Sequence, residues 1–305
     1  MQALFDAIAS AVMPTDAQRI FHGRGGRYPG CEAWNLDAFP PVWLLTKFGE
    51  ATPEEIAALT VALQARHSQV APPEAPLNVV LQTRREGRSE TNVLAGSVPE
   101  PHLVTEDDTR YRVNLQRGQN HGLFLDMAEG RRWVRAHAKG AKVLNLFAYT
   151  CAFSVVALEA GAKEVVNIDM AQGALTTGQQ NHQLNGLNSG AKFLAHDLFS
   201  SWGKVTRMGP YDLVIADPPS YQKGSFVATK DWPRMLRRLP DLLKPGGRAL
   251  LCLNAPEIPE SFLREQLAAE APSMVMEQRL ANPAVFADVS PDRALKVMVA
   301  SLPPL

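Results

Sequence analysis

The sequence has no long hydrophobic run, no cluster of cysteines and no excess of charge of either sign. Its apolar stretches are short and interrupted by charged residues or glycine, and Asp6 lies near the N-terminus, so we expect neither a membrane-spanning helix nor a secretion signal. Cys31, Cys151 and Cys252 are isolated and lack CxxC spacing, which argues against a disulfide framework and against a structural zinc site. We therefore expect a cytoplasmic protein with reduced thiols and no bound metal.

The balance of charge limits what can be said about partners. Lysine plus arginine and aspartate plus glutamate number 31 each, so the chain lacks the strong positive field of many nucleic-acid-binding proteins. The balance hides an asymmetry, because residues 1–110 hold 9 basic and 14 acidic side chains whereas residues 111–305 hold 22 and 17. Local basic patches permit a nucleic-acid partner, but the overall charge does not require one.

The pattern of apolar residues predicts a parallel sheet in the C-terminal two-thirds of the chain. With 305 residues, 46% of them hydrophobic, the chain can form two cores, and we expect two domains. From about residue 140, strand-like runs alternate with helical patterns, which is typical of βαβ units. The predicted strands are residues 142–147, 164–170, 192–197, 211–219 and 248–254. The predicted helices between them are residues 153–160, 171–184 and 231–243, each ending near a glycine or asparagine.

The two ends of the chain complete this organisation. After a predicted helix near residues 260–269, the apolar runs 274–280 and 295–302 follow without a helical pattern between them, which predicts an antiparallel hairpin. The N-terminal part has short strands, turn-forming clusters and a predicted helix near residues 53–69. We therefore expect a smaller α+β domain over residues 1–112. A Rossmann-like α/β domain, with a mostly parallel sheet of seven strands, is expected over residues 113–305.

Polar residues follow the predicted strands and should meet at one edge of the sheet, because ligands of such sheets lie beyond the carboxyl ends of the strands. An acid after the second strand can accept hydrogen bonds from both ribose hydroxyls of an adenosine-containing cofactor, and Asp169 has that position. Asp197 follows the third strand and Asp217 the fourth. The first turn lacks the GxGxxG fingerprint that brings a backbone close to a pyrophosphate, which disfavours NAD.

The run Asp217-Pro218-Pro219-Ser220-Tyr221 is the most specific single motif. Two consecutive prolines lack amide donors and turn the chain out of the sheet, so Pro218 shapes a corner. We expect Asp217 to accept a hydrogen bond or a proton from a nucleobase and Tyr221 to stack on an extruded base. A simple strand terminator is the alternative interpretation of this motif.

Several segments together resemble one family. They are GQNHGLFLDM (118–127), the run from NLFAYTCAFS at residue 145 to NIDM at residue 170, NHQLNGLN (181–188), HDLF (196–199) and DPPSYQKGSF (217–226). They resemble the bacterial 23S ribosomal-RNA large-subunit methyltransferases related to the C5-cytosine and N7-guanine enzymes, over about residues 110–300. The resemblance implies a class I methyltransferase that uses S-adenosylmethionine and releases S-adenosylhomocysteine. The family's RNA-binding PUA domain has no counterpart in residues 1–110, so we expect a member without it.

The resemblance also assigns residues to the cofactor. Its first turn, N-x-F-x-Y-T-G-G-F-S, matches here with Cys151 and Ala152 at the two glycine positions. In C5-cytosine enzymes of this type the attacking thiol follows the fifth strand, where this chain has Ala255, which disfavours that chemistry. The cofactor contacts implied by the resemblance and by the strand ends are Asn120, Phe124, Asp126, Asn145, Phe147, Tyr149, Thr150, Asp169, Asp197 and Asp217.

The N-terminal part offers candidate contacts to RNA. Arg24 and Arg27 lie in a segment rich in glycine and aromatic residues, and Arg84 and Arg85 form a second basic group; plain surface loops are the alternative interpretation. The leading hypothesis is a methyltransferase that modifies a base of 23S ribosomal RNA. A methyltransferase acting on a protein or a small molecule is the first alternative, and it predicts a closed apolar pocket above Tyr221 instead of an open groove flanked by arginines.

A non-catalytic RNA-binding or ribosome assembly factor is the second alternative. The acids after the strands and the Asp-Pro-Pro corner argue against it, because a binding module does not need them. The sequence predicts neither the target nucleotide nor the oligomeric state.

Overall fold

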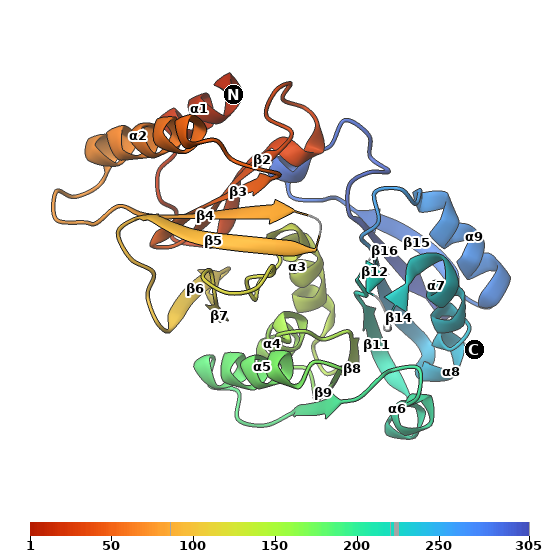
Figure 1. Cartoon of the computed structure of the whole chain (residues 1–305). Helices are drawn as coiled ribbons and strands as arrows, with labels where there is room; N and C mark the ends of the chain where they lie inside the picture. Colours follow the sequence, from red (N-terminus) through yellow and green to blue (C-terminus); the bar gives the residue numbers. More distant parts are fainter. Residues whose placement is uncertain (86, 220, 223–225, 305) are drawn as a thin grey trace. The chain divides into compact units, whose positions relative to one another are not determined.

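The computed structural model describes residues 1–85, 87–219, 221–222 and 226–304, except for the side chains of residues 221 and 222. The chain divides into two compact units (Figure 1). The first comprises Met1–Asp126 and Pro283–Val289, and the second comprises Met127–Asn282 and the chain from Ser290 onward. The sequence placed the boundary after residue 112. The structure places residues 113–126 with the first unit, because hydrogen bonds from Gln82 and Arg84 hold the carbonyl groups of Gly118 and Gln119.

In its described part, the first unit contains a five-stranded sheet, a two-stranded hairpin and helices. Its elements are α1 (Gln2–Ser10), β1 (Gln18–His22), η1 (Gly23–Gly25), β2 (Trp34–Phe39), β3 (Val42–Phe48), α2 (Pro53–Val70), β4 (Asn78–Arg85), β5 (Arg88–Ala95), β6 (His102–Glu106), β7 (Thr109–Val113) and η3 (Ala284–Phe286), with η2 (Leu125–Met127) at its end. The sheet order is β1-β2-β3-β4-β5, and β6 pairs with β7. Strands β3 and β4 are parallel because α2 crosses between them, whereas the other neighbours are antiparallel.

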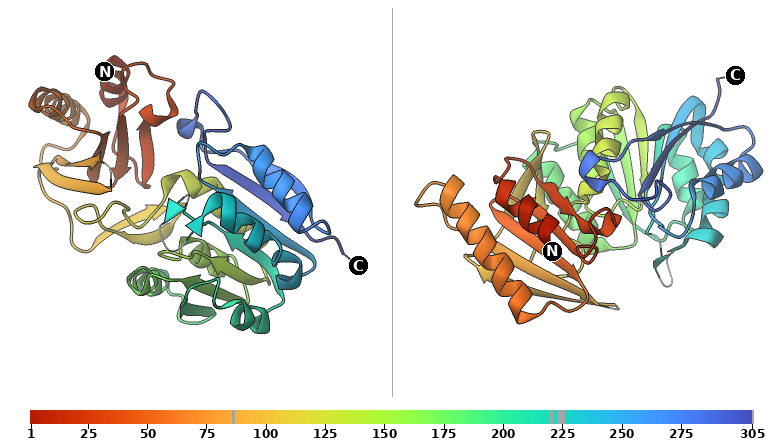
Figure 2. Two further views of the ribbon diagram at one scale, coloured as in Figure 1. Left: turned by 45° about the vertical axis from the view of Figure 1, so that its right-hand side comes forward. Right: turned by 90° about the horizontal axis from the view of Figure 1, so that it is seen from above.

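Local sequence explains where α2 begins. The Thr52 hydroxyl accepts a hydrogen bond from the Glu55 amide at 3.2 Å, the Glu55 carboxylate accepts one from the Thr52 amide at 3.0 Å, and Pro53 opens the first turn. The buried Leu59 and Leu63 of α2 share a core with the buried residues of α1, and the two helices lie side by side (Figures 1 and 2). The helix predicted near residues 53–69 is therefore present and is anchored through these leucines.

The second unit is built on a seven-stranded sheet with the order β10-β9-β8-β11-β14-β16-β15. Its elements are α3 (Ala128–His137), β8 (Lys142–Leu146), α4 (Ala152–Glu159), β9 (Glu164–Asp169), α5 (Gln172–Leu184), β10 (Ala191–Ala195), α6 (Trp202–Met208), β11 (Tyr211–Ala216), β12 (Tyr221–Gln222), β13 (Phe226–Val227), α7 (Ala228–Leu236), α8 (Leu239–Leu242), β14 (Leu243–Leu253), α9 (Glu260–Glu270), β15 (Val275–Leu280) and β16 (Lys296–Ser301). Neighbouring strands from β10 to β14 are parallel, and β16 is antiparallel to both β14 and β15. This confirms the predicted α/β class and the antiparallel hairpin.

Both faces of this sheet are buried under helices (Figures 1 and 2). In β8, Leu144 and Leu146 pack in the core that includes residues of α6 to α9, whereas Val143 packs in the core that includes residues of α3 and α4. Each such buried side chain contributes about 1.5–3 kcal/mol relative to an exposed one. A strand buried on both faces reads as a continuous apolar run, which is why the sequence revealed these strands.

The structure corrects the prediction near residue 240. The sequence predicted one helix over residues 231–243, but α7 ends at Leu236 and the short α8 follows. Pro240 explains the break, because it has no amide hydrogen to continue a helix through that point. Strand β14 also begins at Leu243, earlier than predicted, with a bulge around Gly246 (φ +80°). Helix α6 was not predicted, since its seven residues carry too short a pattern.

Candidate functional site

The register of the second unit's sheet brings the predicted residues to one edge. Leu146, near the end of β8, pairs with Ile168 of β9 on one side and with Ala216 of β11 on the other. The residues after Leu146, Ile168 and Ala216 are Phe147, Asp169 and Asp217. These three therefore lie at one level, at the ends of three adjacent strands. Since neighbouring strands lie about 4.8 Å apart, the backbones of Asp169 and Asp217 are separated by about 10 Å. An elongated ligand that contacts both acids must cross the end of β8.

The turn after β8 has a strained backbone. Phe147, Tyr149 and Cys151 have φ values of +57°, +48° and +62°, a left-handed conformation that residues other than glycine seldom adopt. Each such residue costs on the order of 1–3 kcal/mol, and such strain gathers at ligand sites. Glycine adopts this conformation without steric cost. The glycine of the related turn therefore avoids a strain that this chain has at Cys151. The sequence predicted this segment as a cofactor turn, and that role remains a prediction.

Asp169 connects this turn to β9. Its two carboxylate oxygens accept hydrogen bonds from the amides of Tyr149 and Ala171, each at 2.8 Å, and the residue is half-buried. A carboxylate can accept about four hydrogen bonds, so two ribose hydroxyls can still be accommodated. The neighbouring Met170 is 52% exposed, which provides an apolar surface beside the acid. The residues present therefore fit an adenosine group at this position.

Asp197 and Asp217 complete the row of acids. Asp197 follows β10, and its carboxylate accepts a hydrogen bond from the Phe199 amide at 3.1 Å. Asp217 is half-buried and is followed by the buried Pro218. The backbone of Tyr221 belongs to β12, which pairs with β13, but its side chain lies outside the described part of the structure, as does all of Ser220. The predicted stacking role of Tyr221 and the pocket expected above it fall outside the described residues.

Asn145 and Thr150 lie inside the protein rather than on its surface. Asn145 is 1% exposed, and its amide donates a hydrogen bond to Asn167 at 2.9 Å. The carbonyl of the buried Thr150 accepts a hydrogen bond from the Asn181 amide at 3.0 Å. Asn181 therefore fastens the turn to α5, a role that sequence reasoning did not assign although Asn181 begins the NHQLNGLN segment.

Sequence reasoning also missed a buried chain of hydrogen bonds that continues from Asn145. Asn167 donates to the Ser154 hydroxyl at 3.0 Å, and Ser154 lies 2.8 Å from Nε2 of His182. Nδ1 of His182 lies 2.7 Å from the carbonyl oxygen of Gly178, so Nδ1 carries the proton and Nε2 accepts one from Ser154. Burial lowers the pKa of His182, which favours this neutral form. This series of hydrogen bonds connects β8, β9, α4 and α5 next to the predicted cofactor turn.

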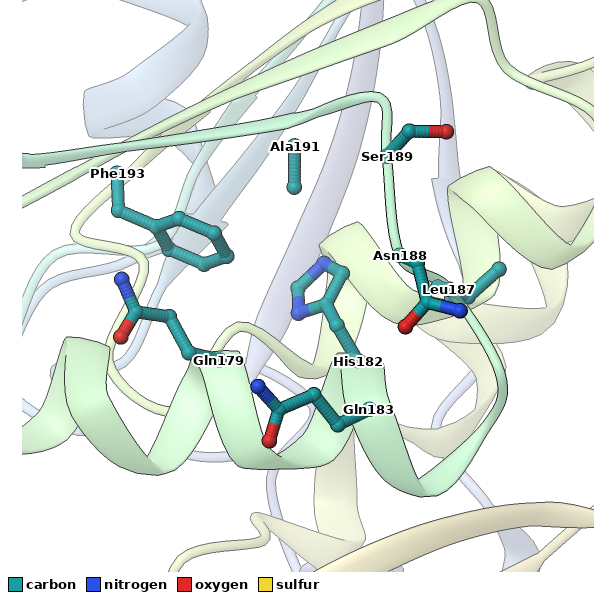
Figure 3. A pocket seen from close by; sticks show the side chains of 8 residues that line it. All are labelled: Gln179, His182, Gln183, Leu187, Asn188, Ser189, Ala191 and Phe193. Carbon is teal, nitrogen blue, oxygen red and sulfur yellow. The ribbon is translucent and has the colours of Figure 1, made fainter.

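His182 also lines a pocket of about 190 Å³. Figure 3 shows side chains of α5 facing Ala191 and Phe193 of β10 across this pocket. The rings of His182 and Phe193 meet edge to face with centroids 5.2 Å apart. The pocket lies beside the first residues of β10, at the opposite end of that strand from Asp197.

The predicted cofactor residues Asn120, Phe124 and Asp126 belong to the first unit. They lie in or after a loop closed by hydrogen bonds from Asn114 to His121 and from Arg84 to Gln119. Within the loop, burial lowers the pKa of His121 to about 4. Phe124 is 39% exposed. Their contact with a cofactor remains a prediction.

The structure places the four predicted RNA-binding arginines in three different surroundings. The guanidinium carbons of Arg24 and Arg84 lie 4.1 and 5.7 Å from the ring centre of Phe48, so one ring gathers two cations from distant parts of the sequence. Arg85 instead forms an ion pair with Glu50 at 2.5 Å. Arg27 is exposed. Phe48 was not predicted, because a single phenylalanine ending an apolar strand carries no signal of its own.

A buried ion pair lies in the same unit. Arg19 forms a two-point interaction with Asp37 at 2.7 and 3.0 Å, and its third nitrogen donates to Nδ1 of His22 at 2.7 Å. Burial, with Arg19 adding to it, lowers the pKa of His22 to about 4, so the ring is neutral near pH 7. Asp37 balances the charge of Arg19.

Comparison with known proteins identifies the family. Residues 18–301 match the family described as S-adenosylmethionine-dependent methyltransferase. The chain therefore belongs to the S-adenosylmethionine-dependent methyltransferases, and S-adenosylmethionine is its cofactor. Within the described residues, no histidine, cysteine, aspartate or glutamate side chains group in a way that would hold a metal ion. No described helix is long and apolar enough to cross a membrane.

Two curated relatives carry names of ribosomal RNA enzymes. The ribosomal RNA large subunit methyltransferase I of Aeromonas salmonicida is 33% identical over 195 residues, which are 62% of this chain and 49% of that protein. The protein of the same name from Erwinia tasmaniensis is 31% identical over 263 residues, 84% of this chain and 65% of that protein. The chain thus spans about half the length of the first relative and less than two-thirds of the second.

Solved structures match the fold over nearly the whole chain. A SAM-dependent methyltransferase from Streptococcus mutans has a TM-score of 0.82 at 23% identity, covering 98% of this chain and 81% of that one. A methyltransferase complexed with SAH has a TM-score of 0.80 at 24% identity, covering 98% and 78%. The fold expected from the sequence is therefore shared along both units.

Proposed function

We propose that this protein transfers a methyl group from S-adenosylmethionine to a base of RNA, and that the RNA is 23S ribosomal RNA. One observation carries the proposal: Asp169 and the Asp217-Pro218 corner flank the strained turn after β8 at one level of the sheet. The names of the curated relatives support ribosomal RNA as the substrate. Such a substrate places the protein in the cytoplasm.

Each residue of the edge has a defined task in this proposal. Asp169 accepts hydrogen bonds from the ribose hydroxyls, and the turn that includes Phe147 and Tyr149 surrounds the cofactor. When bound, S-adenosylmethionine supplies a methyl group on a positively charged sulfur. Asp217 accepts a hydrogen bond from an amino or ring N–H group of the base and takes its proton, and Pro218 holds the corner. Tyr221 stacks on the extruded base.

Residues of the first unit contact the RNA in this proposal. Arg24 and Arg84 bind phosphate groups beside Phe48, and Arg27 adds an exposed charge. Arg85 contributes less, because Glu50 already neutralises it. The resemblance adds Asn120, Phe124 and Asp126 as contacts to the cofactor. These assignments rest on the resemblance and on the local contacts described above.

The class of acceptor is tested with methyl-labelled S-adenosylmethionine. The purified protein is incubated separately with unmodified 23S transcripts, ribosomal subunits, cell protein and a metabolite extract. We expect label in RNA that is lost with Asp217→Ala. Label only in protein or small molecules would support the first alternative and contradict the proposal. If the wild-type protein transfers no label and Asp217→Ala binds RNA as well as the wild-type protein does, the protein would be a binding or assembly factor.

A further inference from the structure

Lys296, the first residue of β16, is fully buried (0% exposed). Its ammonium group donates hydrogen bonds to the carbonyl oxygens of Ala255 at 2.9 Å and Asp292 at 2.5 Å. Taking an ammonium group out of water carries a large desolvation cost, which such hydrogen bonds offset. A methionine or leucine would fill the same space without that cost, so the position requires a reason beyond packing.

The partners of Lys296 lie at the edge of the sheet that holds the predicted site. Because β16 runs antiparallel to β14, the first residue of β16 pairs with Leu253, the last residue of β14. Ala255 lies two residues beyond that pair. The ammonium group of Lys296 therefore holds the segment after β14 in place. Strand β14 is the neighbour of β11, the strand that Asp217 follows.

The fixed segment presents a polar side chain between two buried residues. Leu253 is 1% exposed and Ala255 is 1% exposed, whereas Asn254 between them is exposed. With both neighbours anchored, the backbone of Asn254 has little freedom. An asparagine amide has two donors and one acceptor and can pair with two positions on the edge of a base.

We propose that Asn254 helps to select the target base and that Lys296 is a positioning residue that holds Asn254 beside Asp217. The inference rests on the proposed function, because it deepens the same substrate site. The segment that carries the thiol in related C5-cytosine enzymes here presents an amide and contributes no nucleophile. Asn254 contacts the substrate, whereas Lys296 acts on Asn254 through the carbonyl of Ala255.

The test compares Asn254→Ala, Lys296→Met and the double variant in steady-state methyl transfer to 23S RNA. Asn254→Ala is expected to lower kcat/KM for RNA by about tenfold to a hundredfold, as the loss of a two-point base contact predicts. Its affinity for S-adenosylhomocysteine and its thermal midpoint should not change. Lys296→Met should lower kcat/KM in the wild-type background but have little further effect in the Asn254→Ala background.

A purely structural lysine would give a different pattern. Its loss would reduce kcat/KM by the same factor in both backgrounds, which would overturn the positioning role. Lys244→Met is the control, because Lys244 lies near the start of β14, at the other end of that strand from Asn254, and pairs with Asp212. It should leave kcat/KM unchanged. If Lys296→Met does not fold, Asn254→Ala alone decides, and an unchanged kcat/KM for RNA would overturn the inference. Failure of the wild-type protein to label RNA would instead overturn the proposed function.

Discussion

At the scale of single residues, the turn after β8 shows how this chain accommodates Cys151 at a position where the related turn has glycine. Cys151 has a left-handed backbone and is completely buried (0% exposed), and its sulfur faces Gly178 of α5. A Cβ atom on Gly178 would lie 2.5 Å from that sulfur, which is closer than real contacts allow. The cysteine in the turn therefore depends on a glycine in the helix. The burial that packs the thiol also raises the pKa of Cys151, which keeps it unreactive.

Substituting Gly178 and Cys151, singly and together, tests that dependence. Gly178→Ala should lower the free energy of unfolding by about 1–3 kcal/mol, because the added methyl group overpacks the core. Cys151→Gly should remove both the clash and the backbone strain, so the double variant should recover most of the loss. Urea unfolding of the four proteins measures this cycle. A double variant as unstable as Gly178→Ala would show that the sulfur is not the obstacle.

At the scale of elements, the buried chain from Asn145 to His182 joins two strands and two helices. Its members are polar side chains buried in the protein, so a group that loses its partner has little access to solvent. Ser154→Ala removes the partner of both Asn167 and His182, and each unsatisfied group costs about 1–3 kcal/mol. We expect a lower urea midpoint together with weaker binding of S-adenosylhomocysteine, because the chain supports the cofactor turn.

The matched control is Ser189→Ala, at an exposed position of the segment between α5 and β10. It should leave both quantities unchanged. If Ser154→Ala lowers stability but binds S-adenosylhomocysteine with unchanged affinity in calorimetry, the chain stabilises the fold without supporting the cofactor site.

The elements also show what sequence could and could not predict. Strands β8, β9 and β11 were found because burial on both faces produces continuous apolar runs. Strand β10 lies at the edge of the sheet, where none of its residues is fully buried, and was found from its short apolar run alone. The acids after the strands followed from the rule for parallel sheets. The break before α8 was missed because the apolar pattern continues through Pro240. Asn167, Ser154 and His182 were missed because a polar residue within an apolar element acquires a meaning only when its partners from other elements are known.

At the scale of the whole molecule, the zero net charge conceals how the fold groups individual arginines. Residues 1–110 are more acidic than basic, yet the fold places Arg24 and Arg84 on one phenylalanine ring. Sequence named both arginines but could not distinguish them from Arg85. Only the fold distinguishes Arg84 from Arg85, because Arg84 lies over the ring of Phe48 whereas Arg85 forms an ion pair with Glu50.

This arrangement predicts unequal effects of two neighbouring arginines. Arg24→Ala and Arg84→Ala should each weaken RNA binding several-fold at 150 mM salt and reduce the salt dependence of the affinity by about one phosphate contact. Arg85→Ala should have a smaller effect. Fluorescence anisotropy with a 23S RNA fragment over a range of salt measures both quantities. Equal losses for all three variants would indicate diffuse attraction to the surface rather than a defined site.

In the proposed function, Asp217 and its neighbours methylate a base of RNA. The most direct measurement digests 23S RNA to nucleosides after incubation with methyl-labelled S-adenosylmethionine and the wild-type or Asp217→Ala protein. The account predicts label in one base-methylated nucleoside with the wild-type protein and none with Asp217→Ala. Label on a ribose oxygen, or equal label in the base with both proteins, would contradict it.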